Sequence, residues 1–111
     1  MRKIALPVKD NKLSPHFGEG SYFKFFYEEN GIITKVETIP TPPQIPEQIP
    51  NWLADNGVTD VIAFGIGLIA IDILNRNKIN VFVGVQEKEP EAILRKFLDG
   101  TLETDGNLCD H

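Results

Sequence analysis

Two histidines and one cysteine are the residues of this 111-residue chain best suited to soft-metal or nucleophilic chemistry. His16 lies in the segment Ser14-Pro15-His16-Phe17-Gly18, where the proline stiffens the backbone and Phe17 can anchor the loop in a core. A histidine held in this way can offer an imidazole nitrogen to a metal of soft or borderline character. The alternative interpretation is a histidine that only hydrogen-bonds within its own loop.

Cys109 and His111, the other two of these residues, stand two positions apart at the C-terminus. A thiol and an imidazole at this spacing can both reach one metal ion or cluster. Two ligands do not complete a structural zinc site, which takes four. Catalysis by a Cys–His pair is not expected, because a nucleophile on a terminal segment lacks the positioning that it needs. An incidental cysteine on a frayed terminus is the alternative.

The run from Gly65 to Ala70 reads Gly-Ile-Gly-Leu-Ile-Ala and matches the G-x-G-x-x-G/A pattern of dinucleotide-binding turns. Glu87 follows Gly67 at the spacing expected of an acid that binds ribose. A dinucleotide-binding domain, however, normally carries this motif at its first strand and is built from two halves. The narrower prediction is an anion site, formed by amides at a helix N-terminus next to His16. A structural turn without a ligand is the alternative.

Composition excludes several classes of protein. The chain has the length of one domain, residues 1–111. Its 11 Lys+Arg and 16 Asp+Glu leave a net charge of −5, which argues against a protein that binds duplex nucleic acid or a polybasic protein of the membrane surface. The longest apolar run, residues 61–71, is much shorter than the ~20 residues that span a bilayer. A single cysteine excludes an internal disulfide framework, so we expect a protein of the reducing cytoplasm.

The elements that must position these residues alternate between strands and helices. Strands are predicted at residues 3–8, 22–28, 32–39, 60–64 and 78–84, and Asn30-Gly31 indicates a hairpin between the second and the third. Helices are predicted from about residue 47 or 50 to 56, at 68–75 and at 89–99. The helix at 68–75 is almost wholly apolar, so we expect both of its faces to be covered.

This order of elements predicts an α/β fold with a five-stranded mixed sheet and helices on both faces. The hairpin makes the second strand antiparallel to its neighbours, whereas the later alternation requires parallel pairing with right-handed crossovers. We therefore expect the strand order 3-2-1-4-5. Open α/β sheets bind ligands beyond the carboxyl ends of their strands, which here lie between residues 9–21 and 65–67.

Five parts of the chain carry a resemblance to a known family. They are Ser14–Gly18 with Tyr22-Phe23, Gly65–Gly67, Leu74 with Lys78–Val81, Phe97–Leu102 and Asn107–His111. Together they resemble the dinitrogenase iron–molybdenum cofactor biosynthesis family, which includes NifX-type and NafY-type proteins and the C-terminal domain of NifB. The similarity covers nearly the whole chain, and its most specific parts are the His-Phe-Gly loop and the terminal Asn-x-Cys-x-His.

The resemblance implies a ribonuclease-H-like α/β fold and a protein that binds or carries iron–sulfur or iron–molybdenum clusters and is not an enzyme. His16 matches the family's loop histidine, a candidate cluster ligand, and Cys109 and His111 match its terminal motif. We expect the amides of Gly65 and Gly67 to offset part of the cluster charge. The implied partners are proteins that donate or accept the cluster, and a general cluster-handling role outside nitrogen fixation belongs to the same hypothesis.

A protein-interaction module without metal is the second hypothesis. Such a module docks a P-loop ATPase or a small anion at the Gly65–Gly67 turn, or forms a homodimer through an exposed sheet edge. A nucleotide-binding protein that uses the same turn is a third, and it predicts thermal stabilisation by nucleotides or phosphate.

Overall fold

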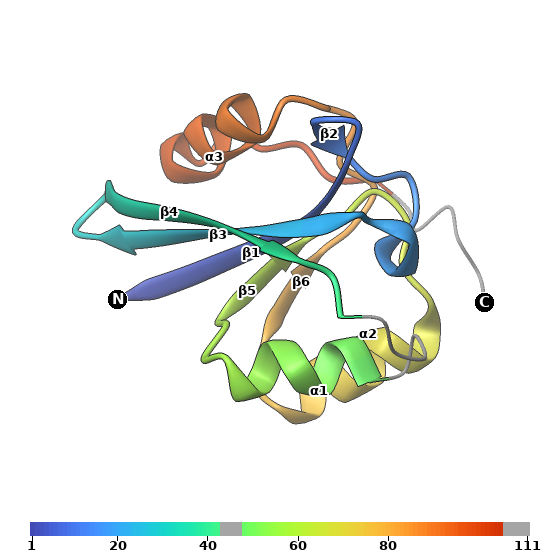
Figure 1. Ribbon diagram of the computed structural model, residues 1–111. Coiled ribbons are helices and arrows are strands. Elements are labelled where there is room, and N and C mark those ends of the chain that lie inside the picture. Colours follow the sequence, from blue (N-terminus) through green and yellow to red (C-terminus); the bar gives the residue numbers. More distant parts are fainter. Residues whose placement is uncertain (43–47, 106–111) are drawn as a thin grey trace.

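The sheet of this α/β fold lies between two helical layers (Figure 1). The structure is a computed structural model and describes residues 1–42 and 48–105. Helices α1 (Gln48–Asp55) and α2 (Leu68–Arg76) cover one face of the sheet, and α3 (Pro90–Asp99) covers the other. The prediction of helices on both faces is therefore confirmed.

Six strands form the sheet within the described residues. They are β1 (Arg2–Lys9), β2 (Lys12–Leu13), β3 (Tyr22–Glu29), β4 (Ile32–Pro40), β5 (Asp60–Ile62) and β6 (Asn80–Phe82). Their order is β4-β3-β1-β5-β6, and β2 pairs with β1. β3 is antiparallel to β1 and β4, whereas β5 is parallel to β1 and β6. The antiparallel hairpin strand beside β1 and the parallel pairing of β1 with β5 are as predicted.

The prediction of a five-stranded sheet in the order 3-2-1-4-5 is corrected to six strands, because an additional strand, β2, pairs with β1 off the main path, and the five predicted strands follow one another as β4-β3-β1-β5-β6. The missed strand is β2, which pairs Leu13 with Val8. Asp10 and Asn11 form the turn before it, with φ of 55° and 66°. A two-residue turn with positive φ at both positions is typical of a type I′ hairpin, but this one lacks the glycine that usually marks it. The ribonuclease-H-like label stays a prediction.

The hairpin of β3 and β4 forms where Asn30-Gly31 predicted it. Both turn residues have positive φ, 54° at Asn30 and 82° at Gly31, as a type I′ turn requires. The turn closes between Glu29 and Ile32. It brings the aromatic strand β3 between β1 and β4, so that β4 becomes one edge of the sheet.

β1 divides the core into two parts, because successive side chains of a strand point to opposite faces. Ala5 joins the cluster under α1 and α2, and Ile4 and Leu6 join the cluster under α3. The largest buried side chains of the first cluster are Phe23, Phe25, Ile49, Leu53, Ile66 and Leu74. Those of the second are Ile4, Leu6, Ile62 and Ile93.

α2 departs from its prediction, because it is not covered on both faces. Leu74 is buried in the core, but Leu68 and Ile69 in the first turn are each 62% exposed. These two side chains reach solvent, whereas Ala70 and Ile71 of the same turn are partly buried against the core. Among the described helices, none is long and apolar enough to cross a bilayer.

Candidate functional site

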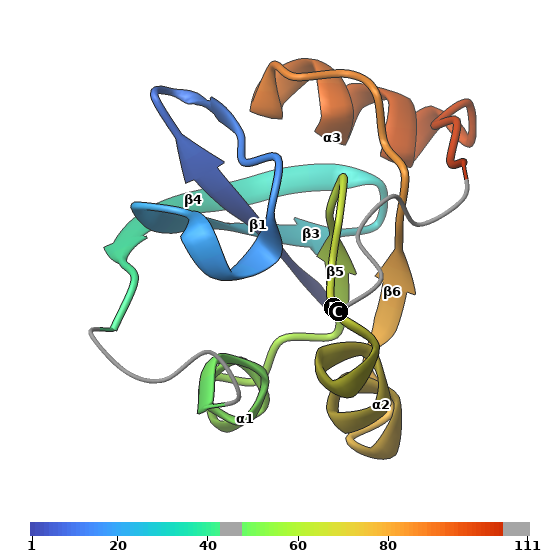
Figure 2. The same ribbon diagram turned by 90° about the vertical axis from the view of Figure 1, so that its right-hand side faces the viewer.

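The loop that carries His16 lies against the turn that leads into α2. His16 stands between β2 and the short helix η1 (Phe17–Glu19), and its backbone forms a parallel bridge with Gly65. The Phe17 N–H donates to the Gly65 carbonyl at 2.9 Å. Figure 2 turns this end of the molecule toward the viewer, with η1 in blue and the turn before α2 in yellow-green. The structure thus brings together two of the segments in which the sequence predicted site residues.

Ser14 shapes the loop from within. It is fully buried, and its Oγ donates to the His16 carbonyl at 2.7 Å and accepts from the His16 N–H at 3.4 Å. Its own N–H donates to the Pro7 carbonyl at 2.9 Å, which ties the loop to β1. The sequence analysis missed this role. A serine two residues before the histidine is the available signal, because Ser side chains commonly close such local turns.

Phe17 anchors the loop in the core, as predicted. Its side chain is 4% exposed and meets Phe23 of β3 edge to face, with ring centroids 5.6 Å apart. His16 precedes it in extended backbone conformation, with φ of −128° and ψ of 133°. The histidine itself is half-buried, with its Nδ1 atom in the interior. The ring is therefore held at the surface by the packing of its neighbour rather than left on a loose loop.

The glycine turn positions the start of α2. Gly67 is the N-cap of the helix, and its carbonyl accepts from the Ile71 N–H at 3.1 Å. The first turn of α2 holds no acidic side chain. The N-terminus of a helix carries partial positive charge and N–H groups that have no partner within the helix. The glycine turn therefore leads into a helix N-terminus near His16, at the place where the sequence predicted an anion site.

Leu68 and Ile69 follow Gly67 directly and form an apolar lip on this end of the molecule, which the sequence analysis did not foresee. Large aliphatic side chains that are each 62% exposed lie side by side at the head of one helix. An apolar patch beside polar groups is typical of a surface that contacts another molecule.

The segment after α3 is hydrogen-bonded to the chain that follows β6 at this end of the sheet. The Asp105 N–H donates to the Val83 carbonyl at 3.1 Å, and the Gly84 N–H donates to the Phe64 carbonyl at 2.9 Å. Gly84 has a φ of 70°, and a Cβ atom on it would overlap the Asp105 backbone. Only glycine fits here, because positive φ and close backbone approach coincide.

Four backbone positions lie next to one another at this end of the sheet, and we call them the end row. They are His16, Gly65, Gly84 and Asp105. Each lies on a different segment beyond the carboxyl ends of the parallel strands or beside them. Open α/β sheets bind their ligands at this edge. The end row is therefore the candidate functional site.

A helix cap leads the chain from α3 toward the end row. Gly100 follows α3 with a φ of 75°, its N–H donates to the Phe97 carbonyl, and the Thr101 N–H donates to the Lys96 carbonyl at 2.9 Å. This is the Schellman arrangement, in which a left-handed glycine reverses the chain at a helix end. The reversal was expected from Gly100 in the sequence.

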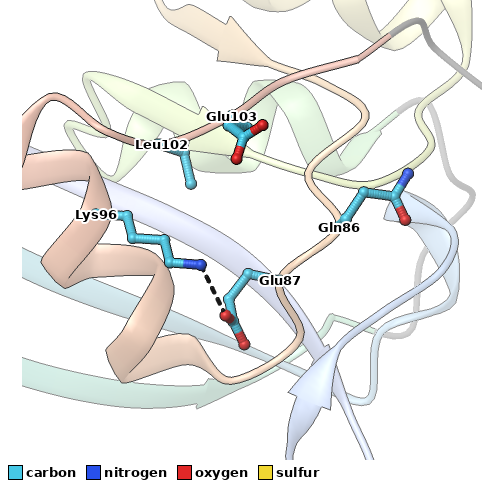
Figure 3. A pocket seen from close by; sticks show the side chains of 5 residues that line it. All are labelled: Gln86, Glu87, Lys96, Leu102 and Glu103. Atoms are coloured by element: carbon cyan, nitrogen blue, oxygen red, sulfur yellow. Dashed lines mark hydrogen bonds and ion pairs between the residues drawn. The ribbon is translucent and has the colours of Figure 1, made fainter.

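A small cavity of about 120 Å³ lies under this segment, and its lining includes both apolar and charged side chains (Figure 3). Lys96 and Glu87 form an ion pair across it, with Nζ and Oε1 3.0 Å apart. The Lys96 ammonium and then the backbone N–H of Glu89 hydrogen-bond Glu87 and lower the pKa of its carboxyl group. The lining residues are Gln86, Glu87, Lys96, Leu102 and Glu103. Because Leu102 and Glu103 belong to the segment before Asp105, the cavity lies between this segment, α3 and residues 86–87.

The remaining predicted site residues, Cys109 and His111, lie outside the described residues. Within residues 1–42 and 48–105, no three side chains of His, Cys, Asp or Glu come together in a group that could hold a metal ion. His16 is the predicted metal ligand that the described chain contains.

Comparison with known proteins identifies the family of this chain. The sequence model of the dinitrogenase iron–molybdenum cofactor family matches residues 1–100, which include His16, Gly65 and Gly67. The match ends before the terminal Cys109 and His111. An uncharacterised protein of Methanocaldococcus jannaschii, MJ0580, is 32% identical over 108 residues, and the alignment covers 93% of this chain and 91% of that protein.

Solved structures share the fold. The crystal structure of PH0822 has a TM-score of 0.86 and 31% sequence identity, and the superposition covers 93% of this chain and 94% of that one. The apo form of the orange protein from Desulfovibrio gigas has a TM-score of 0.75 at 19% identity, over 96% and 95% of the two chains, which shows similarity of fold alone. With a family match over residues 1–100 and relatives that agree along nearly their full length, this chain belongs to the dinitrogenase iron–molybdenum cofactor family.

Proposed function

We propose that this protein binds a metallocluster of iron–sulfur or iron–molybdenum type as cargo and carries it from a donor protein to an acceptor in the cytoplasm, without catalysing a reaction. The observation that carries the proposal is the backbone bridge between His16 and Gly65, which places the His16 loop beside the N-terminus of α2. Family membership supports a cluster-related role, and the chemistry of the site supplies the rest.

His16 supplies the first ligand, because a neutral imidazole suits metals of borderline character. The amides of Gly65, Gly67 and the first turn of α2 offset negative charge on the cargo. This local charge matters because the whole chain carries a net charge of −5. A binding site for an anionic cluster on such a chain needs a local source of positive potential.

Cys109 and His111 supply further ligands in this proposal. Asp105 stands about three strand spacings from His16 along the end row, or about 14 Å. Four residues beyond Asp105 span at most about 14 Å, so a chain that leaves this point is long enough to bring Cys109 to His16. Chain length and the anchoring of Asp105 therefore support a shared site.

Carriage rather than permanent storage fits the supply of ligands. The whole sequence contains two histidines and one cysteine, fewer soft ligands than a fully coordinated cluster takes. Open coordination positions let an acceptor protein take the cargo by ligand exchange. The exposed Leu68 and Ile69 offer that protein an apolar contact beside the site.

The test is anaerobic reconstitution of the protein with iron and sulfide, or with isolated iron–molybdenum cofactor, followed by absorption and EPR spectra. We expect His16→Ala and Cys109→Ala each to lose most of the bound metal and the double variant to lose nearly all of it. Ser21→Ala, an exposed position in the same loop region, is the matched control. A double variant that binds as much metal as the wild type would show that these residues are not the ligands.

A docking module that needs no metal is the second candidate, and the apolar lip of Leu68 and Ile69 is the observation that favours it. A P-loop ATPase or another protein would contact the lip, with the Gly65–Gly67 turn facing its bound anion. In this case Leu68→Gln with Ile69→Gln abolishes retention of the partner, whereas chelation and His16→Ala leave it unchanged. If the cluster carrier is correct, the same double substitution leaves metal loading intact and slows only its transfer.

A further inference from the structure

The outer edge of β4 presents backbone groups that no other strand of the described chain uses. β4 is nine residues long and stands at one end of the sheet, with β3 on its inner side (Figure 1). An exposed strand edge is a template for pairing with another chain. The residues along this edge therefore decide which chain can pair with it.

The middle of β4 is complementary to itself. It reads Thr34-Lys35-Val36-Glu37-Thr38, and a second copy running antiparallel about Val36 places threonine opposite threonine, lysine opposite glutamate and valine opposite valine. Each of these is a stabilising kind of cross-strand pair. Four of the five residues are exposed, Val36 to 48%, and Glu37 is half-buried. Charge and shape both therefore favour a second copy of this chain.

The backbone pattern agrees with this register. The Thr41 N–H donates to the Ser21 carbonyl at 3.1 Å, which marks residues 41 and 21 as a hydrogen-bonded pair of the β3–β4 ladder. Hydrogen-bonded positions alternate along an antiparallel ladder, so Glu37 and Ile39 turn their backbone groups toward β3. Val36 and Thr38 turn theirs to the outer edge. Two copies centred on Val36 can thus exchange hydrogen bonds at that residue.

The charged pair is already oriented on one face of the strand. The Lys35 Nζ lies 3.5 Å from the Glu37 Oε2, and the Tyr27 hydroxyl hydrogen-bonds the other oxygen of Glu37. Lys35 is exposed and Glu37 is half-buried, so a partner strand at the edge can reach both charged groups. In the antiparallel register each meets its opposite charge across the edge.

Two features limit the length of the paired segment. The β3–β4 ladder shifts register between Tyr27 and Glu28, and Pro40 at the far end of β4 has no N–H to donate. A bulge and a proline are common protections of edge strands. They confine pairing to the middle of β4, so the association is reversible and depends on protein concentration.

We infer that two copies of this protein associate through β4, antiparallel about Val36, to form one continuous sheet with two-fold symmetry. Because the two edge strands run in opposite directions, the end rows of the two copies lie at opposite ends of the shared sheet. Dimerisation therefore neither completes nor covers the candidate site. Loss of the dimer and loss of metal binding are separable results.

The test is sedimentation equilibrium of the full chain over a wide concentration range. We expect the wild type to pass from monomer to dimer as its concentration rises, and Lys35→Glu and Glu37→Lys each to remain monomeric because like charges face each other across the edge. An equal mixture of these two variants should form a heterodimer, and the double variant should regain the homodimer. Lys12→Glu makes the same charge change away from the edge and should dimerise like the wild type.

Four results would overturn the inference, three with the wild type and the charge variants and one with a variant of Val36. The first is a wild type that stays monomeric at every concentration. The second is Lys35→Glu that dimerises as well as Lys12→Glu. The third is a mixture of the two charge variants that remains monomeric although circular dichroism shows both to be folded. Val36→Lys, which brings two lysines together at the two-fold axis without changing Lys35 or Glu37, should also remain monomeric, and a dimer of this variant would equally contradict the register.

Discussion

Ser14 and His16 show how single residues build the candidate site. Both hydrogen bonds between them use the serine hydroxyl and the histidine backbone, so the loop is closed without drawing on the imidazole. Phe17 then fixes the next position by burial. His16 is thus positioned by the hydroxyl of Ser14 and by the burial of Phe17.

The first prediction belongs to this scale. Ser14→Ala removes a buried hydroxyl and should lower the free energy of unfolding by about 1 kcal/mol, the net value of one intramolecular hydrogen bond. It should also weaken metal loading, because the His16 loop loses its closure. Urea denaturation and iron content after reconstitution measure the two effects. Ser21→Ala is the control, and equal metal loading in both variants would contradict a positioning role for Ser14.

The residue types of the His16 loop could be interpreted from the sequence, whereas its conformation depends on how the chain packs. Histidine, cysteine and glycine could be picked out in the sequence because their chemistry depends on their side chains or on their lack of one. The position of Ser14 two residues before His16 could indicate a local turn, but its burial could not be predicted, because it depends on β1 lying beside the loop. Burial is a property of the packed chain and not of the residue.

At the scale of elements, the glycine turns decide where segments reverse. Gly31, Gly57, Gly84 and Gly100 have positive φ, and Gly31 coincides with a predicted hairpin and Gly57 and Gly100 with predicted helix ends. Gly84 differs from the others because the backbone of Asp105 occupies the space that a side chain would need. It is the position at which the last described segment joins the sheet.

The second prediction compares two of these glycines. Gly31→Ala meets open space and should cost about 1–2 kcal/mol, the penalty for a left-handed conformation of an L residue. Gly84→Ala should cost clearly more, because Asp105 has to move as well. Urea denaturation of the two variants gives the difference. Equal losses would mean that the segment around Asp105 contributes nothing to stability.

The elements themselves were largely predictable, and the exceptions have physical causes. Alternating or continuous apolar runs and the Asn-Gly turn depend on local interactions, so the hairpin and three helices could be predicted at nearly their observed positions. β2 was missed because its Asp10-Asn11 turn lacks glycine. Leu68 and Ile69 of α2 were expected to be buried, but they are exposed among the described residues. Composition shows that a helix is apolar, but it does not show which elements will pack against it.

On the scale of the whole molecule, paired surface charges set the response to acid. A hydrogen bond from the Tyr27 hydroxyl and the nearby Lys35 lower the pKa of Glu37, and a hydrogen bond from Lys24 lowers the pKa of Glu91. The pKa of Glu87 is lowered by Lys96. A carboxyl group with a lowered pKa in the folded state stabilises that state above its unfolded pKa, and the effect is lost as the pH falls through the folded value.

The third prediction follows from these three glutamates. Above about pH 5 the contribution of these glutamates to the free energy of unfolding should be constant. It should decrease as the pH falls below the ordinary glutamate pKa and through the lowered pKa values of the folded state. Urea denaturation at a series of pH values measures the trend. Lys24→Met should reduce the part that depends on Glu91. A free energy of unfolding that increases as the pH falls through this range would contradict the prediction.

The α/β class, the hairpin, the family resemblance and the residues suited to metal binding could all be predicted from the amino-acid sequence, because each depends on local pattern or on residue type. The packing of the folded chain places His16 against Gly65 and Asp105 against Gly84, and it leaves Leu68 and Ile69 exposed. These are contacts, or missing contacts, between segments far apart in the chain. Which distant segments meet depends on how the whole sheet and its helices pack, and no local pattern contains that information.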